Sequence, residues 1–81
     1  MKRIIWTDQA RADVRALDKS TAMRILSALH RFAESGAGDF KSLQGVDEMR
    51  LRAGDYRLFF VHSGQDTIEV RRVRHRSDAY R

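Results

Sequence analysis

Three β-rich runs in the second half of the chain constrain its fold more than any other feature. They lie near residues 48–53, 56–62 and 67–74, and two short polar turns, 53–55 and 63–66, separate them. Strands joined by such short connections pair in antiparallel order, because a parallel crossover needs roughly a dozen residues or more. The sequence therefore predicts a three-stranded antiparallel meander.

The first half of the chain predicts a strand followed by a helix. Residues 2–6 are β-rich, and Thr7 or Asp8 immediately after them can accept the hydrogen bonds of a helix N-terminus. Asp8 also suits the positive end of a helix dipole. The apolar positions of this helix recur at i, i+4 and i+7, at Ala10, Val14 and Leu17.

A second helix has the clearest amphipathic pattern in the chain. Asp18 or Ser20 can cap its beginning, and Gly36 can end it. The connection to the preceding helix is so short that we expect a helical hairpin. One stripe collects the apolar side chains of the second helix, Ala22, Ile25, Leu26, Leu29, Phe32 and Ala33.

Two helices and one sheet of this size have to share one core, which predicts a single α+β domain over residues 1–81. The N-terminal strand and the meander form one sheet, and the helices cover one of its faces. Residues 36–47 predict a loop, with Phe40 and Leu43 packed on the core.

Side chains alternate between the two faces of a strand, so the sequence also predicts what each face carries. The helix-covered face is expected to hold Met49, Leu51, Ala53, Leu58 and Phe60. Strict alternation places a mixed set on the opposite face, namely Arg50, Arg52, Arg57, Phe59, Val61, Ile68, Val70, Arg72 and Arg74. We expect the arginines at one end of this face and the apolar residues at the other, as a ligand site or as a docking strip for a partner's helix.

The charge of the chain favours an anionic partner. The 81 residues carry a formal net charge of +5, and four arginines lie between positions 71 and 76. This balance favours nucleic acid or an acidic protein. The chain contains no cysteine, which excludes disulfides and thiolate metal sites. The longest apolar run, residues 58–61, is too short to span a membrane, so we expect a cytoplasmic protein.

Three motifs resemble the RelE/ParE superfamily of toxins from bacterial type II toxin–antitoxin systems. They are Leu43-Gln44-Gly45, the segment 50–58 (Arg-Leu-Arg-Ala-Gly-Asp-Tyr-Arg-Leu), and the tail 75–81 (His-Arg-Ser-Asp-Ala-Tyr-Arg). The predicted order of elements also agrees with this family. The resemblance implies one fold with two possible mechanisms: ribosome-dependent cleavage of messenger RNA, or poisoning of DNA gyrase.

The resemblance to the RelE-like nucleases implies catalytic roles for four residues. Arg50 and Arg57 would flank the scissile phosphate and stabilise charge in the transition state, because fixed cations aimed at developing charge are effective catalysts and arginine binds two phosphate oxygens at once. Arg74 would assist the leaving group. Tyr80 would stack on a base or orient the 2′-hydroxyl, or it could simply pack in the tail.

Glu48 departs from the nuclease pattern, which has a basic residue at that position. Glu48 could pair with Arg50 and weaken its field, or it could serve as the general base, since a carboxylate among arginines stays ionised. His75 is a second candidate for acid–base catalysis. Alternation places His75 on the face opposite Arg74, and its alternative role is an exposed histidine in a basic tail.

Further arginines extend the expected nucleic-acid surface, and they are Arg52, Arg72, Arg76 and Arg81. The strand arginines have two alternative roles, as a solvated face or as a dock for an acidic stretch of an antitoxin. His30 and His62 lack metal-ligand spacing with another histidine. We therefore expect neither a metal nor a cofactor.

Of the two mechanisms, the residues favour a metal-independent, ribosome-dependent endoribonuclease that acts on mRNA, because Arg50, Arg57, Arg74 and Tyr80 are present together. The gyrase poison is the alternative, and an inactive binding module that lost catalysis through Glu48 is a third possibility. The expected partners are a cognate antitoxin, acidic or partly disordered when free, and either the ribosome with mRNA or gyrase.

Overall fold

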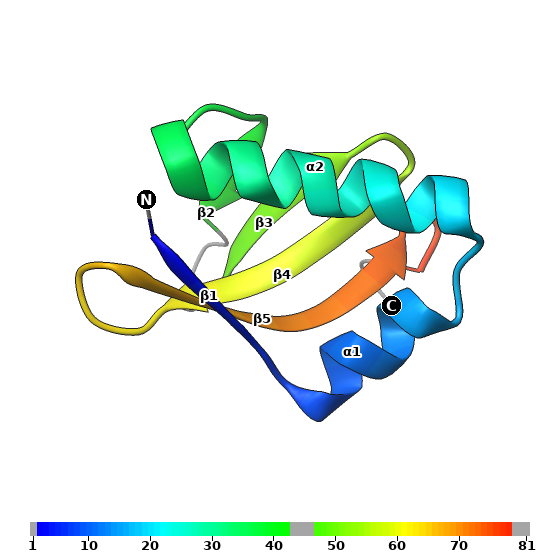
Figure 1. Cartoon of the computed structure of the whole chain (residues 1–81), viewed down its shortest axis with the longest axis horizontal. Coiled ribbons are helices and arrows are strands. Elements are labelled where there is room, and N and C mark those ends of the chain that lie inside the picture. Colours follow the sequence, from blue (N-terminus) through cyan, green and yellow to red (C-terminus); the bar gives the residue numbers. More distant parts are fainter. Residues whose placement is uncertain (1, 43–46, 79–81) are drawn as a thin grey trace.

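The computed structural model describes residues 2–42 and 47–78, and it confirms the α+β fold. A five-stranded sheet has the order β1-β5-β4-β3-β2, in which β1 is parallel to β5 and the other neighbours are antiparallel (Figure 1). The elements follow in the order β1 (Arg3–Trp6), α1 (Asp8–Arg15), α2 (Lys19–Ser35), β2 (Phe40–Ser42), β3 (Met49–Ala53), β4 (Tyr56–His62) and β5 (Thr67–His75).

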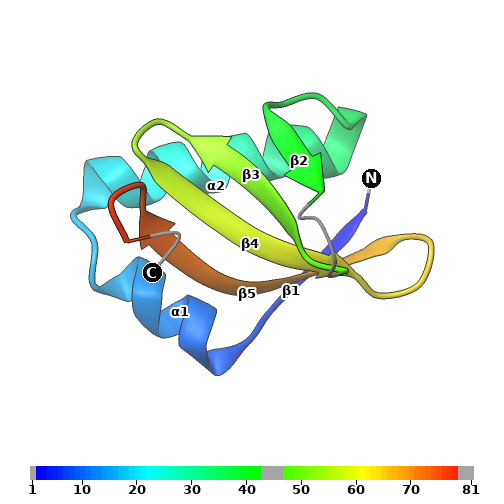
Figure 2. The ribbon, with the colours of Figure 1, turned by 180° about the vertical axis from the view of Figure 1, so that it is seen from behind.

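The two helices leave one face of the sheet uncovered. Helix α2 lies across one face, whereas α1 lies beside β5 at the end where β1 no longer pairs (Figure 1). Seen from behind, β3 and β4 lie in front of α2, and α1 lies beside β5 (Figure 2). The meander therefore has one face packed on α2 and one open face.

The helix boundaries follow from local hydrogen bonds that the sequence predicted. Thr7 caps α1, and its Oγ1 accepts a hydrogen bond of 3.1 Å from the Ala10 N–H. Asp18 caps α2 and accepts hydrogen bonds from the N–H and the hydroxyl of Thr21, which lower the pKa of the Asp18 carboxyl. Gly36 ends α2 with φ +76°, a left-handed conformation that glycine adopts without strain.

The prediction of a loop over residues 36–47 was wrong in part, because Phe40–Ser42 forms strand β2. This strand pairs with β3 at the edge of the sheet, from Phe40 opposite Leu51 to Ser42 opposite Met49. Phe40 is 45 % exposed, but its ring lies 4.9 Å from that of Phe32 on α2, as expected for a side chain at the margin of the core. Leu43 lies outside the described residues.

The face predicted for Ile68 and Val70 was also wrong, because β5 contains a β-bulge. Phe59 pairs with Arg72, but the next residue, Phe60, pairs with Val70, which leaves Arg71 as an extra residue. An extra residue shifts the alternation of side chains by one position. Ile68 and Val70 are consequently fully buried in the core with α2, and only the part of β5 after the bulge turns its arginines to the open face.

The core lies between α2 and the covered face of the sheet. Met49, Leu51, Ala53, Leu58 and Phe60 point into it as predicted. Leu26 departs from the predicted stripe, since it is 39 % exposed. The other buried members of this core are Ala10, Ile25, Leu29, Phe32, Ala33, Ile68, Val70 and Val73.

Strict alternation puts Ile68 and Val61 on the same face of the sheet, but the bulge puts them on opposite faces. Alanine substitutions at the two positions should therefore lower the free energy of unfolding by different amounts. Ile68→Ala is expected to lower the free energy of unfolding by about 2–5 kcal/mol, because it leaves a cavity in the core. Val61→Ala is expected to cost about 1 kcal/mol, because Val61 is only half-buried. Urea denaturation measures both values, and equal costs would contradict the assigned register.

Candidate functional site

The register of the meander gathers five arginines around one phenylalanine on the open face. One row across the strands contains Arg52, Arg57 and Arg74, and the next contains Arg50, Phe59 and Arg72. No helix covers this side of β3, β4 and β5 (Figure 2). We call this surface the arginine face, and it consists of Arg50, Arg52, Arg57, Phe59, Arg72 and Arg74.

Phe59 forms the floor of the arginine face. Its side chain is fully buried although it points away from the main core. The guanidinium carbon of Arg72 lies 4.1 Å from the centre of the Phe59 ring, a cation–π contact. The sequence predicted a separate apolar end for this face, but Ile68 and Val70 belong to the core, and the apolar floor instead lies among the arginines.

Glu48 holds Arg72 in place over this floor. Its Oε1 accepts a hydrogen bond of 3.0 Å from Nη2 of Arg72, and its side chain is only 20 % exposed. The sequence suggested Arg50 as the partner of Glu48, because the two residues share one strand face. The bonded partner on β5 was not predicted, since it depends on the register between three strands.

Asp13 on α1 holds Arg74 in a similar way. Its Oδ2 accepts hydrogen bonds from Nη1 of Arg74 and, at 2.9 Å, from the backbone N–H of Val73. The Val73 N–H needs this acceptor because β1 pairs with β5 only as far as Val70. Sequence reasoning missed Asp13, since only the contact between α1 and the edge of β5 reveals its role.

Arg57 lies between Arg52 and Arg74 in the row of the arginine face next to the β3–β4 turn. Its Nη1 donates to the carbonyl oxygens of Gly54 at 3.1 Å and Tyr56 at 3.0 Å. Among the described residues, no carboxylate lies within ion-pair distance of Arg57. Burial lowers the pKa of Arg57, the neighbouring charges of Arg52, Arg50 and Arg76 lower it further, and the charge of Asp39 offsets a smaller part of this shift.

His75 does not join this group. It pairs with Tyr56 across the strands, on the face opposite Arg74 as alternation predicts, and the two rings lie 5.2 Å apart. Its Nδ1 lies 2.9 Å from the hydroxyl of Ser77. The structure therefore separates this candidate for acid–base catalysis from the arginine face.

Of the tail after β5, the structure describes residues 76–78. Arg76 is exposed, and its backbone N–H donates to the carbonyl oxygen of Asp55 at 2.7 Å, which fixes the start of the tail beside the β3–β4 turn. Tyr80 and Arg81, for which the sequence predicts a catalytic and a nucleic-acid-binding role, lie outside the described residues.

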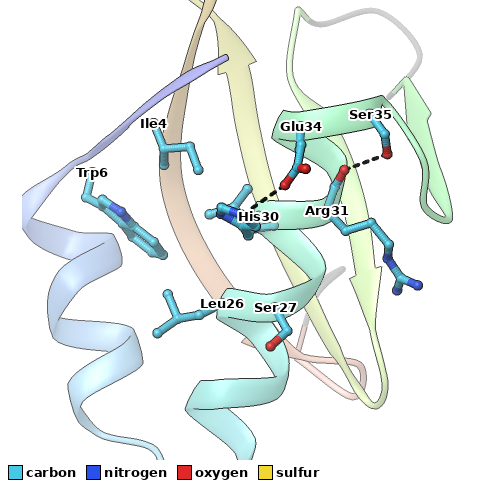
Figure 3. A pocket seen from close by; sticks show the side chains of 9 residues that line it. Ile4, Trp6, Leu26, Ser27, His30, Arg31, Glu34 and Ser35 are labelled. Carbon is cyan, nitrogen blue, oxygen red and sulfur yellow. Dashed lines mark hydrogen bonds and ion pairs between the residues drawn. The ribbon is translucent and has the colours of Figure 1, made fainter. Parts of the chain in front are cut away.

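A groove of about 580 Å³ lies on the other side of the molecule, between β1 and α2 (Figure 3). Its apolar wall includes Ile4, Trp6 and Leu26. The ion pair between His30 and Glu34, 3.0 Å long, is well exposed at its rim. This groove is remote from the arginine face, and it lacks the cluster of cations that phosphate chemistry requires.

Neither a metal site nor a membrane span emerges from the described parts of the chain. Residues 2–42 and 47–78 contain no group of three or more histidine or acidic side chains that could bind a metal ion. No helix among them is long and apolar enough to cross a membrane.

Comparisons with known proteins agree with the resemblance of the motifs. A family model described as the ParE toxin of the type II toxin–antitoxin system parDE matches residues 4–80. The chain belongs to this toxin family. No curated protein sequence matches it. The match to the family model confirms the assignment to the RelE/ParE superfamily.

Solved structures with a similar fold include RelE toxins. A RelB–RelE antitoxin–toxin complex from Methanococcus jannaschii matches with 26 % identity and a TM-score of 0.76, covering 94 % of each chain. A RelE–RelB complex from Pyrococcus horikoshii matches with 23 % identity and a TM-score of 0.77, covering 96 % of this toxin and 98 % of that chain. A YoeB/ParE toxin from Agrobacterium tumefaciens matches with 18 % identity and a TM-score of 0.76, covering 90 % and 96 %.

The hydrogen bonds of Asp13 predict that Asp13→Ala lowers the free energy of unfolding more than Asp13→Asn does. Asp13→Ala removes the partner of a half-buried guanidinium and of an edge N–H, so the free energy of unfolding is expected to fall by about 2–3 kcal/mol. Asp13→Asn keeps an acceptor and is expected to cost about 1 kcal/mol. Urea denaturation gives both values. Asp8→Ala, in the exposed first turn of α1, is the matched control, and an equally large loss there would contradict the role of Asp13.

Proposed function

We propose that this toxin inhibits translation by cleaving ribosome-bound mRNA on its arginine face, without a metal ion. The observation that most supports this proposal is the environment of the Arg57 guanidinium group. This group lies between Arg52 and Arg74 across the strands and donates to two backbone carbonyl oxygens, and among the described residues no carboxylate lies within ion-pair distance of it. Burial and the nearby arginines lower the pKa of Arg57, and the more distant charge of Asp39 offsets this only in part. A phosphate group placed there would relieve this repulsion and gain charge-assisted hydrogen bonds.

The chemistry that fits such a surface is transesterification at a phosphodiester. The 2′-oxygen attacks the phosphorus atom, the 2′-proton passes to a base, and the bond to the 5′-oxygen breaks as that oxygen takes a proton. The products are a 2′,3′-cyclic phosphate and a 5′-hydroxyl. Negative charge builds up on the phosphorane between these steps, and Arg50 and Arg57 stabilise it.

Two hydrogen bonds hold the guanidinium group of Arg74 in one orientation. Asp13 and the Val73 carbonyl oxygen both accept hydrogen bonds from its Nη1, and an arginine has further donors at Nη2 and Nε. Arg74 therefore assists the leaving group with these remaining donors, while Asp13 orients it. Glu48 positions Arg72 over Phe59, and it is also the carboxylate available as a general base beside the face. We assign no step to His75.

A cognate antitoxin is the expected partner. The similar structures from Methanococcus jannaschii and Pyrococcus horikoshii are complexes of RelE toxins with RelB antitoxins. We propose that an acidic antitoxin, partly disordered when free, neutralises this toxin in the same manner.

Poisoning of DNA gyrase is the second candidate, and one observation favours it. The family model that matches residues 4–80 is described by its ParE members. In this alternative, the arginine face would contact gyrase or its DNA, and ion pairs such as that of Arg74 with Asp13 would be structural only.

Parallel mapping of RNA 5′ ends and of DNA breaks separates the two candidates. The toxin is induced in bacterial cells, and 5′ ends are compared between translated and untranslated copies of one message. New 5′ ends confined to the translated copy support the nuclease. Gyrase-linked DNA breaks without new 5′ ends would reject it in favour of the second candidate.

Arg57→Ala is expected to slow single-turnover cleavage of ribosome-bound mRNA by about 10²–10³-fold, because it removes one fixed cation from the transition state. Arg15→Ala on α1 removes the same charge from an exposed side chain beside Trp6 and Leu26 and is expected to leave the rate within about twofold. Circular dichroism confirms that both variants are folded. Full activity of Arg57→Ala would remove Arg57 from the mechanism.

A further inference from the structure

A second group of arginines lines a groove on the helix side of the sheet. The groove has a volume of about 500 Å³ and lies between α2 and the turn that joins β3 to β4. We call it the α2 groove. Its polar lining consists of Ser20, Arg24, Ser27, Arg31 and Arg52.

The positive charge of the α2 groove is almost uncompensated. None of the residues that line it is acidic. Within the described part of the chain, Arg24 and Arg31 have no carboxylate at ion-pair distance. Arg52 lies 3.8 Å from Asp39, and both side chains are more than half exposed, so solvent screens this pair strongly.

The groove presents its donors along one line of α2. Ser20, Arg24, Ser27 and Arg31 follow each other at helical spacing, so they share one side of the helix. The two arginines are two turns apart, which is roughly 10 Å along the axis. Arg31 borders both grooves, because it also lines the apolar groove between β1 and α2, but its guanidinium group points away from Trp6 (Figure 3).

Close packing holds Arg24 at the β3–β4 turn. A Cβ atom added at Gly54 would lie 3.3 Å from Cδ of Arg24, so the stem of Arg24 passes directly over the glycine. Gly54 has φ +61°, which independently favours glycine at this turn. The stem of Arg24 therefore lies against the β3–β4 turn, and a larger residue at position 54 would displace it.

The α2 groove is continuous with the arginine face at the same turn. Arg52 lines the groove and also pairs with Arg57 across the strands. Arg57 in turn donates to the carbonyl oxygen of Gly54, whose backbone forms part of the groove. One bound polyanion can therefore pass from the face around the edge of β3 to α2.

We propose that the α2 groove binds the sugar–phosphate backbone of the RNA on one side of the cleaved nucleotide. This inference rests on the proposed function, which makes RNA the ligand of the arginine face. Guanidinium groups only donate hydrogen bonds, so the ligand has to offer acceptors at successive positions. A phosphodiester backbone offers charged acceptors at every nucleotide, whereas an acidic peptide does so only where an Asp or Glu side chain turns toward the groove.

Fluorescence anisotropy with an uncleavable RNA tests the α2 groove apart from catalysis. The probe is a short fluorescein-labelled single-stranded RNA with 2′-O-methyl riboses, which lack the attacking hydroxyl. Arg24→Gln combined with Arg31→Gln keeps most of both stems. This variant is expected to weaken binding about tenfold and to reduce the slope of log K against log[KCl] by about 1.4, since each phosphate contact on a single strand contributes about 0.7.

The matched control removes two charges from α1 through Arg11→Gln combined with Arg15→Gln. We expect its affinity to stay within about twofold of the wild type, because these exposed residues lie outside the α2 groove. Equal losses in both double variants would show that only net charge matters and would overturn the proposal. Unchanged RNA affinity with weaker binding of the purified antitoxin would overturn it in favour of a protein-binding groove.

Cleavage of ribosome-bound mRNA, measured on the same proteins, separates this proposal from the proposed function. A wild type that cleaves nothing, together with the expected loss of RNA affinity in the α2 variant, rejects the nuclease and supports the groove. A wild type that cleaves, together with wild-type affinity in the α2 variant, supports the nuclease and rejects the groove.

Discussion

The register shift in β5 is the constraint on which the rest of the structure depends. The extra residue Arg71 places Ile68 and Val70 in the core on one side of the bulge and turns Arg72 to the open face on the other. Strand β1 stops pairing at the bulge, and Thr7 replaces it by donating to the carbonyl oxygens of Val70 and Arg71. The bulge thus lets the first half of β5 face the core while Arg72 and Arg74 stay on the open face, and it marks the edge at which α1 docks.

The arginines gathered in this way repel one another, and the chain offsets the repulsion unevenly. Asp13 holds Arg74 and Glu48 holds Arg72, so these two cations are fixed and partly neutralised. Within residues 2–42 and 47–78, the hydrogen-bond acceptors of the Arg57 side chain are two backbone carbonyl oxygens, and burial and neighbouring charges lower its pKa. Arg57 and Arg52 therefore lie together beside the β3–β4 turn, where an anionic ligand would reduce their repulsion.

The sequence predicted those parts of the fold that local chemistry determines. Thr7, Asp18 and Gly36 bound the helices through short-range hydrogen bonds and a left-handed turn, and the spacing of polar turns predicted the meander. The bulge was missed because alternation was assumed to hold along all of β5. The spacing of three between Val70 and Val73, with two arginines between them, was the available signal. The partners of Arg72 and Arg74 depend on tertiary contacts, which no local pattern specifies.

The central claim is that an RNA phosphate occupies the arginine face near Arg57. The most direct measurement is NMR of the ¹⁵N-labelled toxin titrated with the 2′-O-methyl RNA. The Nε–H signal of Arg57 is expected to shift and to be protected from solvent exchange. The indole N–H signal of Trp6, in the apolar groove between β1 and α2, is expected to stay unchanged. A shift of the Trp6 signal with an unchanged Arg57 signal would contradict the claim.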